Sequence, residues 1–196
     1  MEAEKSDEPT QPTGATEGEL RLLQQVRIIL ALKHAKTDGQ PAEIYPFLYL
    51  GSVGAAMNKN NLQRLGITHV LCVADNIKPQ FPSLFTYKSL EILDTAQADL
   101  LSIIPECFEY IEGALNTGGK VLLHCFAGKS RSASVCIAYV MYSQRISLLE
   151  AFRYVREKRN LALPNTGFMR QLKTYEGALG LTSGEKRPEE DTENSN

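Results

Sequence analysis

The sequence predicts an α/β fold, in which a central and mainly parallel sheet has helices on both faces. Two short apolar runs, at 68–74 and 120–124, are typical of buried strands. A long apolar segment after the second run is typical of a mostly buried helix. Strands that alternate with helices along a chain indicate a parallel sheet. The chain has 196 residues, which is long enough for one domain with a proper core.

A basic amphipathic helix is expected at 19–40, ahead of the domain. The capping box Thr16-x-x-Glu19 predicts its start, and the run Asp38-Gly39-Gln40-Pro41 predicts its end. Its apolar residues share one face between basic residues: Leu22, Leu23, Val26, Ile29 and Leu30 beside Arg21, Arg27 and Lys36. Two interpretations are open. The apolar face packs on the domain, or it is exposed and binds a partner such as calmodulin, which grips helices of this kind.

The domain itself is expected at 42–180. Its first half should contain a tight strand pair at 44–52, a helix that Gly66 closes, and the strand at 68–74. A further strand at 87–93 delivers Asp94. A helix from about 103 to 115, with a proline in its first turn, then leads to the 120–124 strand.

Two more helices are predicted in the C-terminal part. Ser147-x-x-Glu150 is a second capping box. The helix that it starts is expected to bury an apolar face and expose a basic one, with Leu148, Leu149, Phe152 and Val155 inside and Arg153, Arg156, Lys158 and Arg159 outside. Asn165 is the expected N-cap of the last helix, which Gly180 closes.

The segment 121–132 is where the sequence indicates chemistry. An apolar strand runs into a turn that opens a helix, and such a turn presents backbone N–H groups and the positive end of the helix dipole to an anion. Cys125 lies at the start of this turn and Arg131 at its end. The turn could therefore hold a phosphate, gripped by the guanidinium, with the sulfur beneath the phosphorus. A buried cysteine in an ordinary turn is the alternative.

The pattern His124-Cys125-x5-Arg131-Ser132 resembles the cysteine-dependent protein tyrosine phosphatases, and more narrowly the small dual-specificity phosphatases, plant members included. The resemblance covers about 42–180 and implies the dual-specificity phosphatase fold. It also implies that Cys125 attacks phosphorus to form a cysteinyl-phosphate. Ser132 would assist the sulfur as it leaves, and His124 would orient the loop. The phosphoryl oxygens would be held by the side chain of Arg131 and by backbone N–H groups of Phe126, Ala127, Gly128, Lys129, Ser130 and Arg131.

Asp94 is the expected general acid. A phosphate ester cannot easily lose an alkoxide, so a carboxyl group must protonate the leaving oxygen. The sheet order that the family implies brings Asp94, which lies 31 residues before Cys125, over the mouth of the turn. Asp99 is the competitor, but we expect it to cap the following helix. By the same resemblance, Asn165 either only caps its helix or also ties the active-site loops together. The reaction needs no metal and no cofactor.

The four cysteines, at 72, 107, 125 and 136, show no CxxC spacing. This distribution argues against a zinc site and against a disulfide framework, and it favours a reducing compartment, the cytosol or the nucleus. The family fold places Cys72 near the catalytic loop. There it is either a packed core residue or a redox partner that forms a reversible disulfide with Cys125.

The formal net charge of −2 conceals a division along the chain. Residues 1–19 carry six acidic residues against one lysine, and 182–196 carry five against two basic residues, which leaves 12 acidic and 18 basic residues between them. The tails at 1–18 and 181–196 are expected to be disordered, whereas the basic body suits an anionic substrate. No apolar run reaches transmembrane length, and the polar first twenty residues are unlike a secretory signal.

The resemblance implies a phosphoprotein substrate, with mitogen-activated protein kinases as family-level candidates, and no nucleic acid partner. The chain between Gly51 and Cys125 has no obvious insertion to build a deep pocket, which favours action on phosphotyrosine and on phosphoserine or phosphothreonine. The alternatives are a phosphoinositide phosphatase, whose family loop usually has two lysines where this chain has Phe126 and Lys129, and a phospho-binding scaffold. Some plant dual-specificity phosphatases bind calmodulin, which favours an exposed helix at 19–40.

Overall fold

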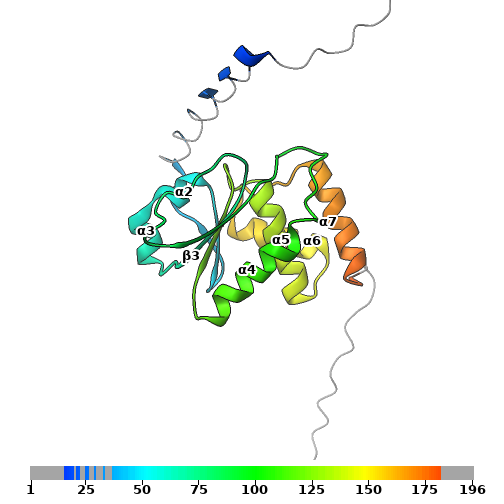
Figure 1. Cartoon of the computed structure of the whole chain (residues 1–196). Helices are drawn as coiled ribbons and strands as arrows, with labels where there is room; N and C mark the ends of the chain where they lie inside the picture. Colours follow the sequence, from blue (N-terminus) through cyan, green and yellow to red (C-terminus); the bar gives the residue numbers. More distant parts are fainter. Residues whose placement is uncertain are drawn as a thin grey trace, which may run out of the picture.

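Figure 1 shows the computed structural model of the chain. The structure describes residues 37–181 and, before them, 16–19, 21–22, 25–26, 29 and 33. Most of the two predicted disordered tails lies outside the described residues. The described part holds five strands, β1 (Ala42–Tyr45), β2 (Leu48–Gly51), β3 (His69–Val73), β4 (Thr86–Leu90) and β5 (Val121–His124). Its helices after residue 40 are α2 (Val53–Met57), α3 (Lys59–Arg64), α4 (Ile104–Asn116), α5 (Arg131–Gln144), α6 (Leu148–Lys158) and α7 (Thr166–Ala178).

The strands form one sheet in the order β1-β2-β5-β3-β4. The β1–β2 hairpin is antiparallel, and the other three pairings are parallel. The predicted mainly parallel sheet is therefore confirmed. β5 occupies the middle of the sheet, so the loop that follows it lies between the carboxyl ends of β2 and β3. Parallel α/β sheets bind ligands at this edge.

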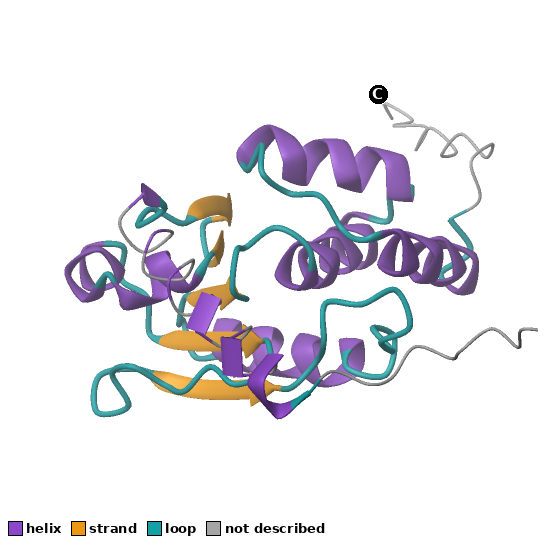
Figure 2. Ribbon diagram, turned by 90° about the horizontal axis from the view of Figure 1, so that it is seen from above, coloured by secondary structure: helices purple, strands orange, loops and turns teal. Residues whose placement is uncertain are grey.

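Helices cover both faces of the sheet, as Figures 1 and 2 show: α2 and α3 lie on one side and α4 to α7 on the other. The larger core forms around α5, whose first eleven residues, from Arg131 to Met141, are all buried. The smaller core packs Leu62 of α3 and Phe85 against sheet residues such as Leu122. The predicted long apolar helix after the loop is thus the centre of the larger layer.

β4 is shorter than the sequence predicts. We expected a strand at 87–93, but it ends at Leu90. β4 is an edge strand that pairs only with β3, and the last pair of that ladder is Val73 with Leu90. The chain therefore leaves the sheet three residues early, and 91–93 form the start of the loop that carries Asp94.

α6 begins at the predicted capping box, but two of its predicted exposures are wrong. Ser147 Oγ accepts a hydrogen bond from the N–H of Glu150, whose carboxylate accepts one from the N–H of Ser147. Leu149, expected inside, has 55% of its surface exposed. Arg159, expected outside, is only 5% exposed. Arg159 follows the last helical residue and has an extended backbone, so the helical period no longer sets its direction.

The N-terminal segment is helical at the described residues from Glu17 to Thr37. The predicted capping box is present, since the N–H of Thr16 donates to Glu19 Oε2 at 2.6 Å and the N–H of Glu19 donates to Thr16 Oγ1 at 3.3 Å. The described apolar residues of the segment, Leu22, Val26 and Ile29, are exposed. These three residues therefore do not pack on the domain. Within the described residues, none of the helices has the length and apolar character needed to cross a membrane.

Candidate active site

The loop between β5 and α5 is held by hydrogen bonds to its carbonyl oxygens. The carbonyl oxygens of Cys125 to Ser130 each accept a hydrogen bond from a group that lies on the outer side of the loop. The partners are His124 Nδ1, the N–H groups of Val53, Leu163 and Ser134, and the guanidinium of Arg159, at distances of 2.7 to 3.2 Å. Because the carbonyls point outward, the backbone N–H groups of the loop face its inner side, which makes an anion-binding nest. Phe126 and Ala127 are partly exposed and Lys129 is exposed.

Cys125 lies at the floor of this loop. It is 1% exposed, and Ser132 Oγ donates a hydrogen bond to its sulfur at 3.2 Å. Ser132 is the second residue of α5, so the hydroxyl approaches from the helix side. A hydroxyl donor at this distance stabilises negative charge on sulfur.

Arg131 lies at the other end of the loop, where α5 begins, and is 8% exposed. Its Nη1 donates to Asp75 Oδ1 at 2.7 Å and to the carbonyl oxygen of Ile92 at 3.2 Å. Its Nε is buried, has no hydrogen-bond partner among the described residues, and lies 3.8 Å from Asp94 Oδ2. Buried donors without a partner are rare and costly, so the guanidinium has a donor that suits an anion.

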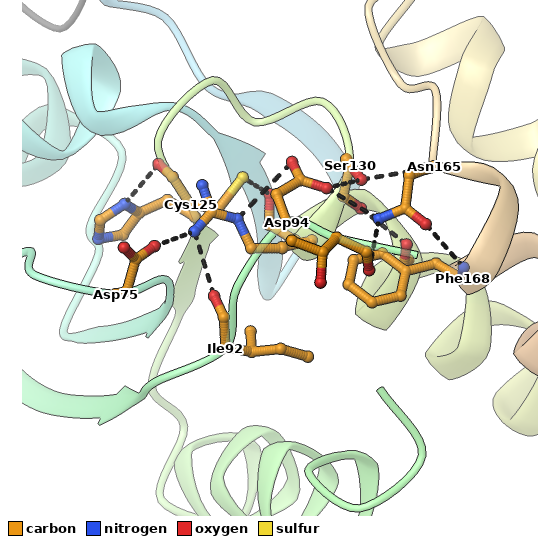
Figure 3. Close-up of polar contacts among 12 residues, drawn as sticks. Asp75, Ile92, Asp94, Cys125, Ser130, Asn165 and Phe168 are labelled. Carbon is orange, nitrogen blue, oxygen red and sulfur yellow. Dashed lines mark hydrogen bonds and ion pairs between the residues drawn. The ribbon is translucent and has the colours of Figure 1, made fainter. Parts of the chain in front are cut away.

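Asp94 lies above the loop and is held by two donors. Ser130 Oγ donates to Asp94 Oδ1 at 2.6 Å, and Asn165 Nδ2 donates to the same oxygen at 3.0 Å (Figure 3). Asp99, by contrast, accepts a hydrogen bond from the N–H of Ser102 in the turn before α4. The expectation that Asp99 caps the following helix is therefore wrong: Asp99 caps the turn before α4, and the cap position of α4 is Ile103, which makes no side-chain cap hydrogen bond.

Asn165 does more than cap its helix. Its Oδ1 accepts the N–H of Phe168 at 2.9 Å, which is the predicted N-cap contact of α7. Its backbone N–H donates to Ser130 Oγ at 3.1 Å, and its Nδ2 also donates to the carbonyl oxygen of Thr95 at 3.3 Å. One side chain thus joins the loop after β4, the loop after β5 and the start of α7.

His124 and Cys72 lie side by side behind the nest, on neighbouring strands. Burial lowers the pKa of His124 to about 4, so the ring is neutral at pH 7 and its Nδ1 carries the proton that it shares with the Cys125 carbonyl. Burial, and next the nearby Cys125, raise the pKa of the Cys72 thiol to about 12. All four cysteines are free. In the described part of the chain no three metal-ligating side chains come together.

Sequence reasoning missed two residues of this site, Asp75 and Arg159. Asp75 lies two residues after Val73, the last residue of β3, at the carboxyl edge of the sheet, and that position was an available signal. Arg159 offered none, because its carboxylate partner, Asp38, is 121 residues away in the chain.

A parallel sheet whose central strand runs into an anion-binding loop, with a thiol on its floor and an arginine at its end, defines the class of the protein as an α/β phosphatase. The family model described as dual specificity phosphatase, catalytic domain, matches residues 48–178. The chain belongs to this family, and it is a protein phosphatase for tyrosine and for serine or threonine.

Individual relatives agree with this assignment. Dual specificity protein phosphatase 1 of Arabidopsis thaliana is 41% identical over 157 residues, which cover 80% of this chain and 79% of that protein. Dual specificity protein phosphatase 1-A of Xenopus laevis is 44% identical over 142 residues, which cover 72% of this chain but 38% of that protein. The crystal structure of human tyrosine phosphatase-like serine/threonine/tyrosine-interacting protein has a TM-score of 0.68 at 42% identity, over 70% of this chain and 96% of that one.

Proposed function

We propose that the chain hydrolyses phosphoproteins through a cysteinyl-phosphate on Cys125. The sulfur attacks phosphorus, the bond to the leaving oxygen breaks, and the phosphoryl group remains on sulfur. Arg131 Nε and the inward N–H groups of the loop hold the phosphoryl oxygens in line. The observation that carries this proposal is the buried Arg131 Nε, a donor without a hydrogen-bond partner among the described residues, in the same loop as the thiol.

Asp94 protonates the leaving oxygen in this mechanism. It then acts as a base and takes a proton from the water that hydrolyses the cysteinyl-phosphate. Ser130 and Asn165 fix the orientation of its carboxyl group through the oxygen Oδ1, which leaves Oδ2 to exchange the proton. Ser132 stabilises the sulfur as the thiolate leaves.

Two variants test these roles. Cys125→Ser should abolish turnover of p-nitrophenyl phosphate, because the serine hydroxyl stays protonated at neutral pH and a neutral hydroxyl is a much poorer nucleophile than a thiolate. Asp94→Ala should still bind substrate but lower kcat by about 10²–10⁴ on a substrate with a poor leaving group. On an aryl ester with a good leaving group the loss should be much smaller. An equal kcat for Asp94→Ala and wild type on the poor leaving group would remove Asp94 from the mechanism.

The substrates we propose are phosphotyrosine and phosphoserine or phosphothreonine in proteins, with mitogen-activated protein kinases as first candidates. Lys129 is the one lysine of the loop, and Phe126 stands where a phosphoinositide phosphatase usually has another. Purified protein assayed with doubly phosphorylated kinase peptides and with inositol phospholipid vesicles separates the two classes. Faster release of phosphate from the vesicles would favour the lipid phosphatase.

We further propose that the 19–40 helix binds calmodulin, in the cytosol or the nucleus. Its support is the exposure of Leu22, Val26 and Ile29, three apolar residues on a basic helical segment. A calcium-dependent pull-down with wild type should retain calmodulin, and the double variant Val26→Glu, Ile29→Glu should lose it while phosphatase activity stays unchanged. If wild type retains no calmodulin in the presence of calcium, this proposal is wrong.

A reversible Cys72–Cys125 disulfide is the redox proposal. Peroxide would oxidise the Cys125 thiolate to sulfenic acid, and the Cys72 thiol would displace water to form the bridge. The support is the strand register, which sets Cys72 opposite His124, the residue before Cys125. The raised pKa of Cys72 predicts slow closure. Mass spectrometry after mild peroxide should find the bridge, and only sulfinic acid at Cys125 would contradict it.

A further inference from the structure

The middle of the phosphate-binding loop is held from behind by a single side chain of another element. Arg159 Nε donates to the carbonyl oxygen of Gly128 at 2.7 Å, and Arg159 Nη2 donates to that of Ala127 at 3.1 Å. The flanking carbonyls of Phe126 and Lys129 instead accept backbone N–H groups. The two carbonyls at the middle of the loop thus depend on the position of one guanidinium.

Asp38 fixes this guanidinium. Its two carboxylate oxygens accept hydrogen bonds from Arg159 Nη1 at 3.3 Å and from Arg159 Nη2 at 2.6 Å. The Asp38 side chain is 15% exposed, so the ion pair is largely desolvated. A carboxylate bound bidentately on one side makes the planar guanidinium present its other N–H groups in one fixed direction, which a lysine could not do.

Asp38 is itself tied to the domain. Ser52 Oγ donates to its carbonyl oxygen at 3.1 Å, and the side-chain amides of Asn58 and Asn61 donate to that of Gly39. Asp38 follows directly after Thr37, the last helical residue of the N-terminal segment. The residue that orients Arg159 is therefore also the point where that segment joins the domain.

Gly128 makes the close approach of Arg159 feasible. Its φ is +62°, and a Cβ placed there would lie 2.4 Å from the carbonyl oxygen of Gly51 and 2.6 Å from Arg159 Nη2. Any side chain at this position would push the guanidinium away from the loop. The loop, the glycine and the ion pair are therefore packed as one unit.

We infer that Asp38 and Arg159 form a positioning pair. Asp38, at the end of the N-terminal segment, orients Arg159, and Arg159 in turn sets how well the phosphate-binding loop holds a phosphoryl group. The pair lies behind the loop and does not touch the substrate. It acts by keeping the carbonyls of Ala127 and Gly128 turned outward, so that the N–H groups stay turned inward. This inference rests on the proposed function, in which the loop binds the phosphoryl group.

The test uses the full chain and tungstate, a tetrahedral anion, as the probe in isothermal titration. Asp38→Asn keeps the shape of the side chain but removes its charge, and we expect about 10-fold weaker tungstate binding, because small misplacements of such donors have effects of up to about 10². Glu176→Gln is the matched control. Glu176 is a buried carboxylate that accepts the N–H of Leu148 in α6. It should lower Tm and leave tungstate affinity unchanged.

A double-variant cycle shows whether Asp38 acts through Arg159. Arg159→Lys should weaken tungstate binding by itself, and adding Asp38→Asn to it should change the affinity less than about 2-fold, because the two residues act as a unit. If Asp38→Asn lowers Tm but leaves tungstate affinity at the wild-type value, the positioning pair is overturned and the proposed function stands. If wild type does not bind tungstate, both are overturned.

Discussion

The phosphate-binding loop has a buried arginine on each of its two sides, and the two are used differently. Both pair with an aspartate that is distant in the chain, Arg131 with Asp75 and Arg159 with Asp38. On the inner side, Arg131 Nε has no hydrogen-bond partner among the described residues. On the outer side, Arg159 Nε and Nη2 donate hydrogen bonds to carbonyl oxygens of the loop. We therefore expect Arg131 to bind the ligand with its remaining donor, whereas Arg159 uses its donors to hold the shape of the loop.

The largest effect is expected on the inner side. Arg131→Lys keeps a positive charge but loses the planar fork, so it cannot bond Asp75 and two phosphoryl oxygens at once. Loss of a preorganised donor of this kind costs about 10²–10³ in kcat/KM. Steady-state kinetics on a phosphopeptide measure it, with Arg159→Lys in parallel. An equal or larger loss in Arg159→Lys would reverse the assignment of the two sides.

A second effect concerns His124, which lies behind the loop and should act on stability. Its folded pKa of about 4 lies below the usual value near 6.5, so the unfolded chain binds a proton first as pH falls. Stability is therefore present above pH 6.5 and is lost between pH 6.5 and pH 4, by about 3 kcal/mol at most from this residue. Urea unfolding at pH 7 and pH 4.5 measures this loss.

The control for this effect is His124→Asn, which should be less stable at pH 7 but should lose less free energy of unfolding than wild type between the two pH values. An identical loss in both proteins would mean that His124 titrates normally in the fold.

The smallest effect is expected at Asp75, which orients Arg131 from the side. Asp75→Asn keeps a hydrogen-bond acceptor for Arg131 Nη1 but removes the charge, so we expect about a 10-fold loss in kcat/KM. The loss should appear mainly in KM, because a tilted guanidinium weakens binding of the phosphoryl group equally in the ground state and in the transition state. A lower kcat with an unchanged KM would contradict this role and place Asp75 in the chemical step.

Much of the fold and the site could be predicted from the sequence because it is encoded locally. The strand, turn and helix around Cys125 are contiguous, and the capping boxes at Thr16 and Ser147 are short patterns with a direct physical cause. Asn165 contacts Asp94, so of its two alternatives the structure shows the one that ties the loops together, whereas the role of Asp94 as the acid stays a prediction.

The predictions were wrong where the burial of a residue or the length of a strand depends on residues far away in the chain. Arg159 was expected outside because a helical period was extended one residue past the end of α6, where the backbone is already extended. Leu149 was expected inside, but its exposure depends on how α5 and α7 pack beside α6, which a period cannot give. Leu90 ends β4 because its only neighbouring strand stops at Val73. The contact of Asp75 with Arg131 could be predicted only with the sheet order, in which β3 lies next to β5.

Rapid-quench trapping tests the central claim most directly. Wild type is mixed with a phosphopeptide labelled at phosphorus, quenched in acid within milliseconds, and digested for mapping. A thiol-bound phosphate on the peptide that contains Cys125, absent from Cys125→Ser, is the predicted result. Full turnover without any label on the protein, or label on another residue, would contradict the mechanism.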